Sequence, residues 1–236
     1  MGQVAQRLSA VRQRIDTACA KAGRDPGEVR LMAVSKTHPP DLLREAYEAG
    51  HRLYGENKVQ EAVAKAGALT DLDELRWAFV GHLQTNKARD VAAFAAEFHA
   101  LDSFRVARAL DRRLQELGHG LDVYLQVNSS GEESKFGLAP REMVSFASTL
   151  RECSALRVRG LMTLAANSDD ERVVRSSFET MRKLQERLRG SDTAAGSYDE
   201  LSMGMSGDFE LAIEYGATTV RVGQAVFGAR PAPVDA

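Results

Sequence analysis

Cysteine is scarce in this sequence, and neither sign of charge dominates it. The 236 residues include two cysteines, Cys19 and Cys153, which lie far apart and form no CxxC pair. This spacing excludes a disulfide framework and a cysteine-ligated metal site, and it indicates two reduced, mostly buried thiols in a reducing compartment. Because 31 Lys and Arg residues nearly balance 33 Asp and Glu residues, we expect no general attraction to nucleic acid or to an anionic membrane.

Long apolar runs are absent as well. No stretch of the sequence approaches the roughly 20 apolar residues that span a bilayer. The first 20 residues carry Arg7, Arg12 and Arg14, which interrupt any apolar core of a signal peptide. The five histidines are too scattered to form a metal-ligand set. We therefore expect a cytoplasmic protein without a bound metal.

An amphipathic pattern opens the chain. Val4, Leu8, Val11, Ile15 and Ala18 recur at helical spacing, and charged residues lie between them. The pattern stops before a glycine and a proline, which commonly end helices. It predicts a helix within residues 1–23 that packs on the main fold.

Eight short apolar runs then alternate with helical patterns. The predicted strands cover residues 31–36, 53–56, 76–81, 98–102, 121–128, 156–163, 201–203 and 219–222. The predicted helices cover residues 39–50, 57–67, 85–94, 104–117, 140–153, 169–188 and 206–215, with a short one near 225. So many β–α units in about 200 residues favour a closed barrel over an open sheet. We expect a single (β/α)8 barrel of the TIM type over residues 1–228 and a loose tail at 229–236.

The lysine that ends the first predicted strand is a candidate for chemistry, because barrel enzymes act at the carboxyl ends of their strands. Alternation places Lys36 on the same face as Met32 and Val34. If that face is the barrel interior, Lys36 lies at its top, where a lysine must be solvated, paired or used covalently. A buried lysine supplies the neutral amine that attacks a carbonyl. A lysine that simply reaches solvent is the alternative.

Glycine-containing loops follow the last two predicted strands. Ser206 and Gly207 follow the seventh strand, where Ser206 could cap the next helix or turn its hydroxyl and the following amides toward an anion. Gly223 and Gln224 follow the eighth strand. Barrels often bind phosphate with these two loops, so we expect an anion site here, with an ordinary serine-capped turn as the alternative.

Arg221 lies within the eighth predicted strand and alternates with Thr219, which predicts that its side chain points into the barrel. An inward arginine needs an acceptor. A ring nitrogen, a carboxylate or a phosphate would serve, and a structural ion pair with Glu56 is the alternative.

Other polar residues at strand ends have two interpretations each. Asn57 could hydrogen-bond a ligand hydroxyl or cap the next helix. His82 could act as an acid or base or be a structural histidine, and Lys87 could contact an anion or lie at the surface. Residues 132–137, which include Lys135, suggest a mobile loop with solvated charges.

Taken in order, these pieces resemble the YggS/PROSC family, also called the pyridoxal phosphate homeostasis proteins. The matching stretches are AVSK at 33–36, YGEN at 54–57, FVGHLQTNK at 79–87, VN at 127–128 with residues 132–137, GLMT at 160–163, LSMGMS at 201–206 and VRVG at 220–223. The resemblance covers nearly the whole chain. It implies the barrel of fold type III enzymes, similar to the barrel domain of alanine racemase, with pyridoxal 5′-phosphate (PLP) as cofactor.

The resemblance also assigns roles to individual residues. It implies that Lys36 forms the internal aldimine with PLP and that Arg221 faces the pyridine nitrogen. Ser206, Gly223 and Gln224 match phosphate-binding positions, and we add Gly207 and Asn57 as further cofactor contacts. At position 224 the family more usually has a small hydroxyl residue, so this contact would use the backbone amide.

The implied function is to hold PLP as a Schiff base, to buffer it and to deliver it to PLP-dependent apoenzymes. An arginine at the pyridine nitrogen leaves the ring a poor electron sink, which disfavours carbanion chemistry. The sequence also lacks the added β domain that supplies the second base in racemases, so we expect a monomer or weak dimer rather than an efficient enzyme. The alternatives are an amino-acid racemase of low activity and a phosphosugar enzyme that forms a Schiff base with its substrate.

Overall fold

Eight parallel strands close into a barrel in the computed structural model, which describes residues 2–229. The strands are β1 (Arg30–Val34), β2 (Leu53–Glu56), β3 (Arg76–Phe79), β4 (Glu97–Leu101), β5 (Leu121–Val127), β6 (Leu156–Thr163), β7 (Glu200–Ser202) and β8 (Thr219–Val222). Each strand pairs with the next one along the chain, and β8 pairs with β1 to complete the circle. The predicted (β/α)8 barrel is therefore confirmed.

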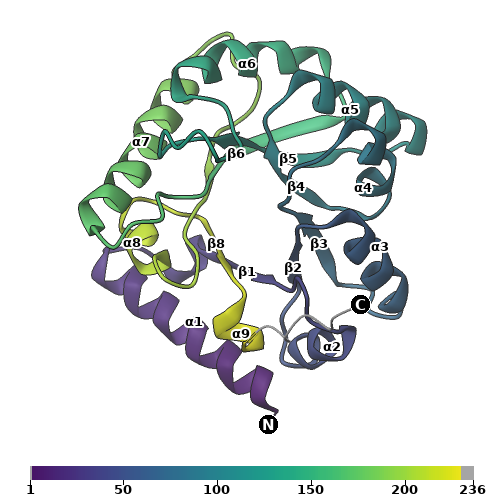
Figure 1. The fold of residues 1–236 in the computed structure, drawn as a ribbon, viewed down its shortest axis with the longest axis vertical. Helices are drawn as coiled ribbons and strands as arrows, with labels where there is room; N and C mark the ends of the chain where they lie inside the picture. Colours follow the sequence, from purple (N-terminus) through teal and green to yellow (C-terminus); the bar gives the residue numbers. More distant parts are fainter. Residues whose placement is uncertain (1, 230–236) are drawn as a thin grey trace.

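Helices form a ring around the strands, as Figure 1 shows. The α-helices are α1 (Gln3–Lys21), α2 (Pro40–Glu48), α3 (Val59–Ala68), α4 (Ala88–Phe94), α5 (Phe104–Leu117), α6 (Met143–Thr149), α7 (Glu171–Arg189), α8 (Phe209–Glu214) and α9 (Gln224–Phe227). Short 3-10 turns are η1 (Pro26–Glu28), η2 (Thr85–Lys87), η3 (Pro140–Glu142) and η4 (Leu150–Glu152). Alternating strands and helices bury the outer face of the sheet, which explains why the strands read as short apolar runs.

The main hydrophobic core lies between the outer face of the barrel and the helices, and it includes Ala33, Tyr54 and Phe98. The barrel interior holds a second, smaller apolar cluster, made by Met32 and Leu53 with Ala78. Ala33 and Met32 are neighbours in β1 and belong to different clusters, as the alternation of side chains in a strand requires.

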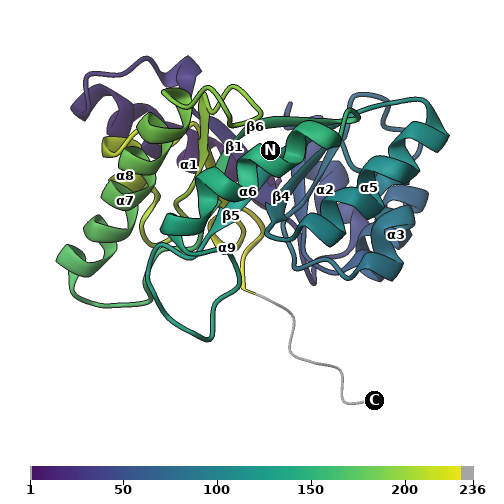
Figure 2. The same cartoon turned by 90° about the horizontal axis from the view of Figure 1, so that it is seen from above.

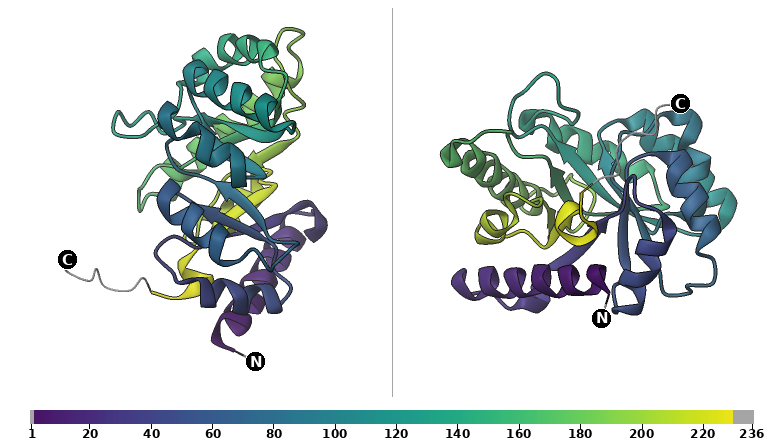
Figure 3. Two further views of the ribbon diagram at one scale, coloured as in Figure 1. Left: turned by 90° about the vertical axis from the view of Figure 1, so that its right-hand side faces the viewer. Right: turned by 60° about the horizontal axis from the view of Figure 1, so that its bottom comes forward.

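The N-terminal helix packs on the barrel as its amphipathic pattern predicts. The five apolar positions of that pattern are all buried in α1. The helix runs alongside α8 and α9, so the first and last helices of the described chain lie together (Figure 3). Arg7 strengthens this contact, because its guanidinium donates to the carbonyl of Phe227 at 3.2 Å.

Several predicted boundaries are wrong by a few residues. β1 ends at Val34, so Lys36 lies in the following turn rather than at the strand end. The helix predicted at 206–215 begins only at Phe209, because Ser206, Gly207 and Asp208 form a turn. The helix predicted at 140–153 is three shorter pieces, η3, α6 and η4. Most of the predicted loose tail, residues 230–236, lies outside the described residues.

Two smaller expectations concern the thiols and the membrane. Cys19 and Cys153 are both buried free thiols, as expected. Within residues 2–229, no helix is long and apolar enough to cross a bilayer.

Leu8 provides a test of the contact between α1 and the barrel. Its side chain is fully buried, so we expect Leu8→Ala to lower the free energy of unfolding by about 2–5 kcal/mol. Urea denaturation with an unchanged m-value measures this loss. Ser9→Ala, on the exposed face of the same helix, is the matched control and should change stability by less than about 0.5 kcal/mol. Equal effects of the two substitutions would contradict the packing described for α1.

Candidate functional site

One cavity of about 470 Å³ opens at the carboxyl ends of the strands. All seven residues selected from the sequence line it: Lys36, Asn57, Ser206, Gly207, Arg221, Gly223 and Gln224. The remaining lining residues include Val34, His38, His82, Gln126, Phe136, Met162, Leu164 and Met205. The loop between β5 and α6 extends from the barrel on the same side as α9 (Figure 2), and its Phe136 lines the cavity. The structure therefore brings together, from both ends of the chain, the residues proposed to act together.

Lys36 reaches this cavity from the turn after β1. Met32 belongs to the apolar cluster inside the barrel, and Val34 lines the cavity above it, so Lys36 continues the inward face of the strand. The next residue, Thr37, has a φ of 69°, in the left-handed region that a β-branched residue rarely adopts. Strain of this kind costs on the order of 1–3 kcal/mol and persists only where the surroundings hold it.

A buried ion-pair cluster holds the turn on both sides of Lys36. Lys65 of α3 donates to the carbonyl oxygen of Ser35 at 2.7 Å, to Glu56 Oε1 at 2.6 Å and to Glu61 Oε1 at 2.7 Å. The Ser35 hydroxyl donates to Glu56 Oε1, and the backbone N–H of Thr37 donates to Glu61. The residues before and after Lys36 are therefore both fixed by the same cluster.

The two acids of this cluster differ in their environment. Burial raises the pKa of Glu56, although its contacts with Lys65 and Ser35 act in the opposite direction. Burial also acts to raise the pKa of Glu61, but the hydrogen bonds from Lys65 and from the Thr37 N–H outweigh it, so that pKa is lowered. An ammonium shared by two carboxylates is stable in the interior only while all three groups remain.

Arg221 forms the floor of the cavity as a buried cation. Its side chain is 4% exposed, and its guanidinium donates to Thr163 O at 2.7 Å, to Ser202 O at 2.6 Å and to Ser202 Oγ at 2.9 Å. Within the described part of the chain, no carboxylate oxygen lies within 4 Å of it. Glu56 instead pairs with Lys65, so the alternative of an Arg221–Glu56 ion pair is wrong. Burial lowers the pKa of Arg221 to about 10, which leaves it charged at neutral pH.

The turn after β7 carries two of the predicted anion contacts. Gly204 begins it with a φ of 91°, and an added Cβ would lie 2.8 Å from the Cα of Phe209, so only glycine fits. The interpretation of Ser206 as a helix cap is wrong, because Asp208 occupies the N-cap of α8. Asp208 instead accepts from the N–H of Met205, which closes the turn. In residues 2–229 the N–H groups of Ser206 and Gly207 donate to no other protein oxygen, so they can serve an anion.

The turn after β8 approaches β1 closely. An added Cβ at Gly223 would lie 2.9 Å from the carbonyl oxygen of Val34, so a side chain there would separate the two strand ends. Gly223 is the N-cap of the short α9, and Gln224 is its first residue. The glycine thus keeps the start of α9 close to the end of β1, and Gln224 lines the same cavity as Lys36.

Asn57 also faces the cavity and does not cap a helix. Lys58 occupies the N-cap of α3, so the capping interpretation of Asn57 is wrong. The side-chain oxygen of Asn57 is buried and has no hydrogen-bond partner among the described residues. A buried acceptor of this kind is costly unless a ligand donates to it.

The rim of the cavity is partly aromatic. Phe136 is 58% exposed and stacks on His82, with ring centroids 4.1 Å apart. His82 Nδ1 lies 3.8 Å from Asp102, whose pKa is raised by burial. The expectation that the loop at 132–137 only carries solvated charges is wrong for Lys135, which donates to Glu132 and to the carbonyl of Ala165. Lys87 does not line the cavity.

Comparison with known proteins identifies the family. The sequence model described as "Alanine racemase, N-terminal domain" matches residues 6–231. A pyridoxal phosphate homeostasis protein of Escherichia coli is 42% identical over 233 residues, which cover 98% of each chain. One from Aquifex aeolicus is 41% identical over 225 residues, which cover 95% of this chain and 97% of the relative. The chain belongs to the pyridoxal phosphate homeostasis protein family.

Solved structures agree with this membership. PipY of Synechococcus elongatus, a structure described as having PLP bound, shares 37% sequence identity with this chain at a TM-score of 0.84. The alignment covers 96% of this chain and all of PipY. Alanine racemase from Corynebacterium glutamicum aligns at a TM-score of 0.66 with 16% identity and covers 63% of the racemase, which shows a shared fold.

Lys65 provides a test of the cluster beside Lys36. Lys65→Met would leave the fully buried Glu56 without its cation, so we expect the free energy of unfolding to fall by about 3–5 kcal/mol. Urea denaturation measures the loss, and Lys58→Met on the exposed side of the same segment is the control. Adding Glu56→Gln to Lys65→Met should recover part of the loss, because it removes the unpaired charge. A Lys65→Met protein as stable as the control would contradict the cluster's role.

Proposed function

We propose that this protein holds PLP covalently, as a Schiff base on Lys36, in the cavity at the top of the barrel. The observation that carries the proposal is the meeting, in one cavity, of Lys36 with a buried Arg221 that has no carboxylate within 4 Å among the described residues. Membership of the pyridoxal phosphate homeostasis family and the PLP-bound structure of PipY support it.

The residues present fit the chemistry of PLP, which supplies an aldehyde, a ring nitrogen, a ring hydroxyl and a phosphate. Lys36 provides the amine for the aldehyde, and Arg221 provides charged N–H donors for the ring nitrogen. The amides of Ser206 and Gly207, the Ser206 hydroxyl and the Gly223–Gln224 backbone would hold the phosphate. The buried side-chain amide of Asn57, whose oxygen has no partner among the described residues, would contact a polar group of the ligand. Each unusual feature of the cavity thus has a counterpart in the ligand.

An arginine at the ring nitrogen suits a protein that binds PLP without using it in catalysis. A permanent cation at the ring nitrogen keeps that nitrogen unprotonated, so electrons from a bound amino acid are poorly stabilised in the ring. We therefore propose a protein that buffers PLP and delivers it to PLP-dependent apoenzymes, acting as a monomer or weak dimer in the cytoplasm. The two buried free thiols support the location in a reducing compartment.

Amino-acid racemisation is the second candidate function. It needs a base besides Lys36, and His82 with Asp102 beside it supplies one at the cavity rim. An enzyme acting on a phosphosugar through Lys36 is the third, and it differs from the others in one observable. Its purified form would be colourless, whereas bound PLP makes a protein yellow.

Substitution of Lys36 tests the proposed attachment. Lys36→Ala removes the only amine that the proposal assigns to the aldehyde, so we expect the visible absorption band of bound PLP to disappear while the fold remains intact. Titration with PLP, followed by absorption and by circular dichroism, measures both properties. Lys58→Ala, at an exposed neighbouring lysine, should keep the band. A Lys36→Ala protein that retains the band would place the Schiff base on another lysine.

Substitution of Ser206 tests the phosphate site. Ser206→Ala removes one charge-assisted hydrogen bond, so we expect PLP affinity to fall by about 1–2 kcal/mol, or roughly 5- to 30-fold. The dissociation constant from equilibrium titration measures this change. Ser9→Ala, on the exposed face of α1, is the same substitution away from the cavity and should leave the constant unchanged. Unchanged affinity in Ser206→Ala would remove this hydroxyl from the site.

A further inference from the structure

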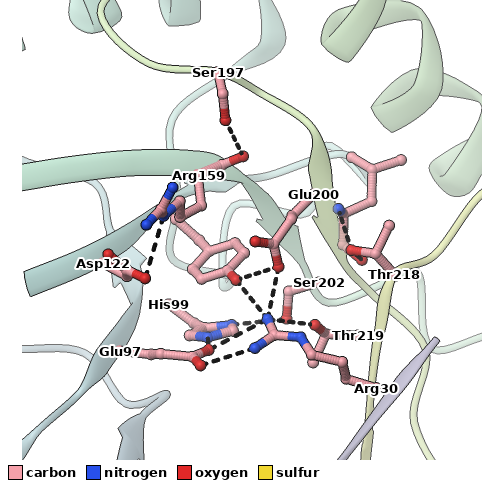
Figure 4. Close-up of polar contacts among 12 residues, drawn as sticks. Arg30, Glu97, His99, Asp122, Arg159, Ser197, Glu200, Ser202, Thr218 and Thr219 are labelled. Atoms are coloured by element: carbon pink, nitrogen blue, oxygen red, sulfur yellow. Dashed lines mark hydrogen bonds and ion pairs between the residues drawn. The ribbon is translucent and has the colours of Figure 1, made fainter. Parts of the chain in front are cut away.

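A chain of hydrogen bonds leads from Arg221 into the barrel, away from the cavity. Arg221 Nη1 lies 2.9 Å from Ser202 Oγ, which lies 2.8 Å from His99 Nδ1. His99 Nε2 in turn lies 2.9 Å from Glu97 Oε2. Figure 4 shows His99 between Ser202 and Glu97. We call these four residues, Arg221, Ser202, His99 and Glu97, the axial chain; three of them lie below the cavity and do not line it.

With a neutral His99 ring, the donors and acceptors of the axial chain have one consistent order. Glu97 is a carboxylate and can only accept, so His99 Nε2 carries a proton. His99 is fully buried, and burial lowers its pKa, although Glu97 acts in the opposite direction. In the neutral form of the ring, which burial favours, Nδ1 accepts the hydroxyl proton of Ser202. Ser202 Oγ is then left to accept from Arg221, so every link points toward Glu97.

Charged groups around the lower end keep Glu97 ionised. Burial acts to raise the pKa of Glu97, but His99 and Arg30 outweigh it and lower that pKa to about 2. Arg30 of β1 donates to Glu97 at 2.9 Å and to Glu200 of β7 at 2.6 Å (Figure 4). It also donates to Tyr124 of β5 at 2.7 Å. The chain thus ends at a stable negative charge inside the barrel.

The axial chain leaves the ligand-facing side of Arg221 available. Both N–H bonds of Nη1 are used by Ser202, through its carbonyl and its hydroxyl, and one bond of Nη2 is used by Thr163. None of these acceptors is a carboxylate, so none competes with a ligand as a direct ion pair. A polarised hydrogen-bond chain instead links the guanidinium to the charge of Glu97 through Ser202 and His99.

We propose that Ser202 and His99 are positioning residues for cofactor binding. They fix the plane of the Arg221 guanidinium and couple it to Glu97, so that Arg221 presents oriented, charged donors to an aromatic ring nitrogen. This inference rests on the proposed function, because it assumes that PLP occupies the cavity.

Two substitutions break the axial chain at different links. Ser202→Ala removes the hydroxyl and keeps the carbonyl contact with Arg221. His99→Phe removes both ring nitrogens and keeps a ring that can stack on Tyr124, whose centroid lies 3.8 Å away. Each variant is titrated with PLP to give the dissociation constant and the absorption maximum of the bound cofactor, and thermal unfolding is followed in parallel.

We expect each single variant to bind PLP about 5- to 20-fold more weakly, the effect of one charge-assisted hydrogen bond, and to shift the absorption maximum in the same direction. The double variant should bind PLP no more weakly than the weaker-binding of the two single variants, because both changes break the same chain. Tyr124→Phe, which keeps the stacking on His99 and loses contacts to Glu200 and Arg30, is the control. It should lower the melting temperature without moving the spectrum.

The outcomes separate this inference from the proposed function. Wild-type protein that takes up no PLP would overturn both. Wild-type protein that binds PLP, with Ser202→Ala matching it in affinity and spectrum, would overturn the positioning role alone. Additive losses in the double variant, or a spectral shift equally large in Tyr124→Phe, would also overturn it, because either result describes independent packing defects.

Discussion

Closure of the barrel by β8 against β1 is the constraint on which the site depends. The pairing sets Met32 opposite Arg221 and Ala33 opposite Val222, so the turns that follow the two strands share one edge. Lys36 and Gly223 leave from these turns and line the same cavity, although they lie near opposite ends of the chain. A barrel left open between β8 and β1 would separate the amine from the residues proposed to hold the ring and the phosphate.

The two buried cations Lys65 and Arg221 have different kinds of acceptor. Lys65 is neutralised directly by Glu56 and Glu61, and this pairing serves to hold the turn around Lys36. Arg221 receives only neutral oxygens from Thr163 and Ser202. A fully paired cation is suited to structure, because its donors are satisfied, whereas a cation held by neutral acceptors remains available to a ligand. This contrast is the physical reason for assigning Arg221, and not Lys65, to the cofactor.

The sequence predicts the barrel and the residues of the cavity better than it predicts the buried contacts that hold those residues in place. Short apolar runs between helical patterns locate the strands, and strand ends in a barrel face one opening, so the sequence predicts that Lys36 and Arg221 line one cavity. The sequence predicts a helix start at Ser206, where the structure has a turn, because a serine before an apolar run is also a capping signal. The contact of His99 with Ser202 cannot be read from the sequence, since it crosses the barrel interior between strands that are not neighbours. Lys65 is not among the predicted residues, because a lysine within a helical pattern usually lies at the surface, whereas this one is buried in α3.

Reduction of the PLP-loaded protein with borohydride, followed by peptide mapping, tests the central claim most directly. Borohydride fixes a Schiff base as a stable secondary amine, so the adduct marks the lysine that held the cofactor. The account predicts one modified peptide, which contains Lys36, and loss of the yellow colour as the adduct forms. An adduct on a different lysine, or a protein that takes up no PLP before reduction, would contradict it.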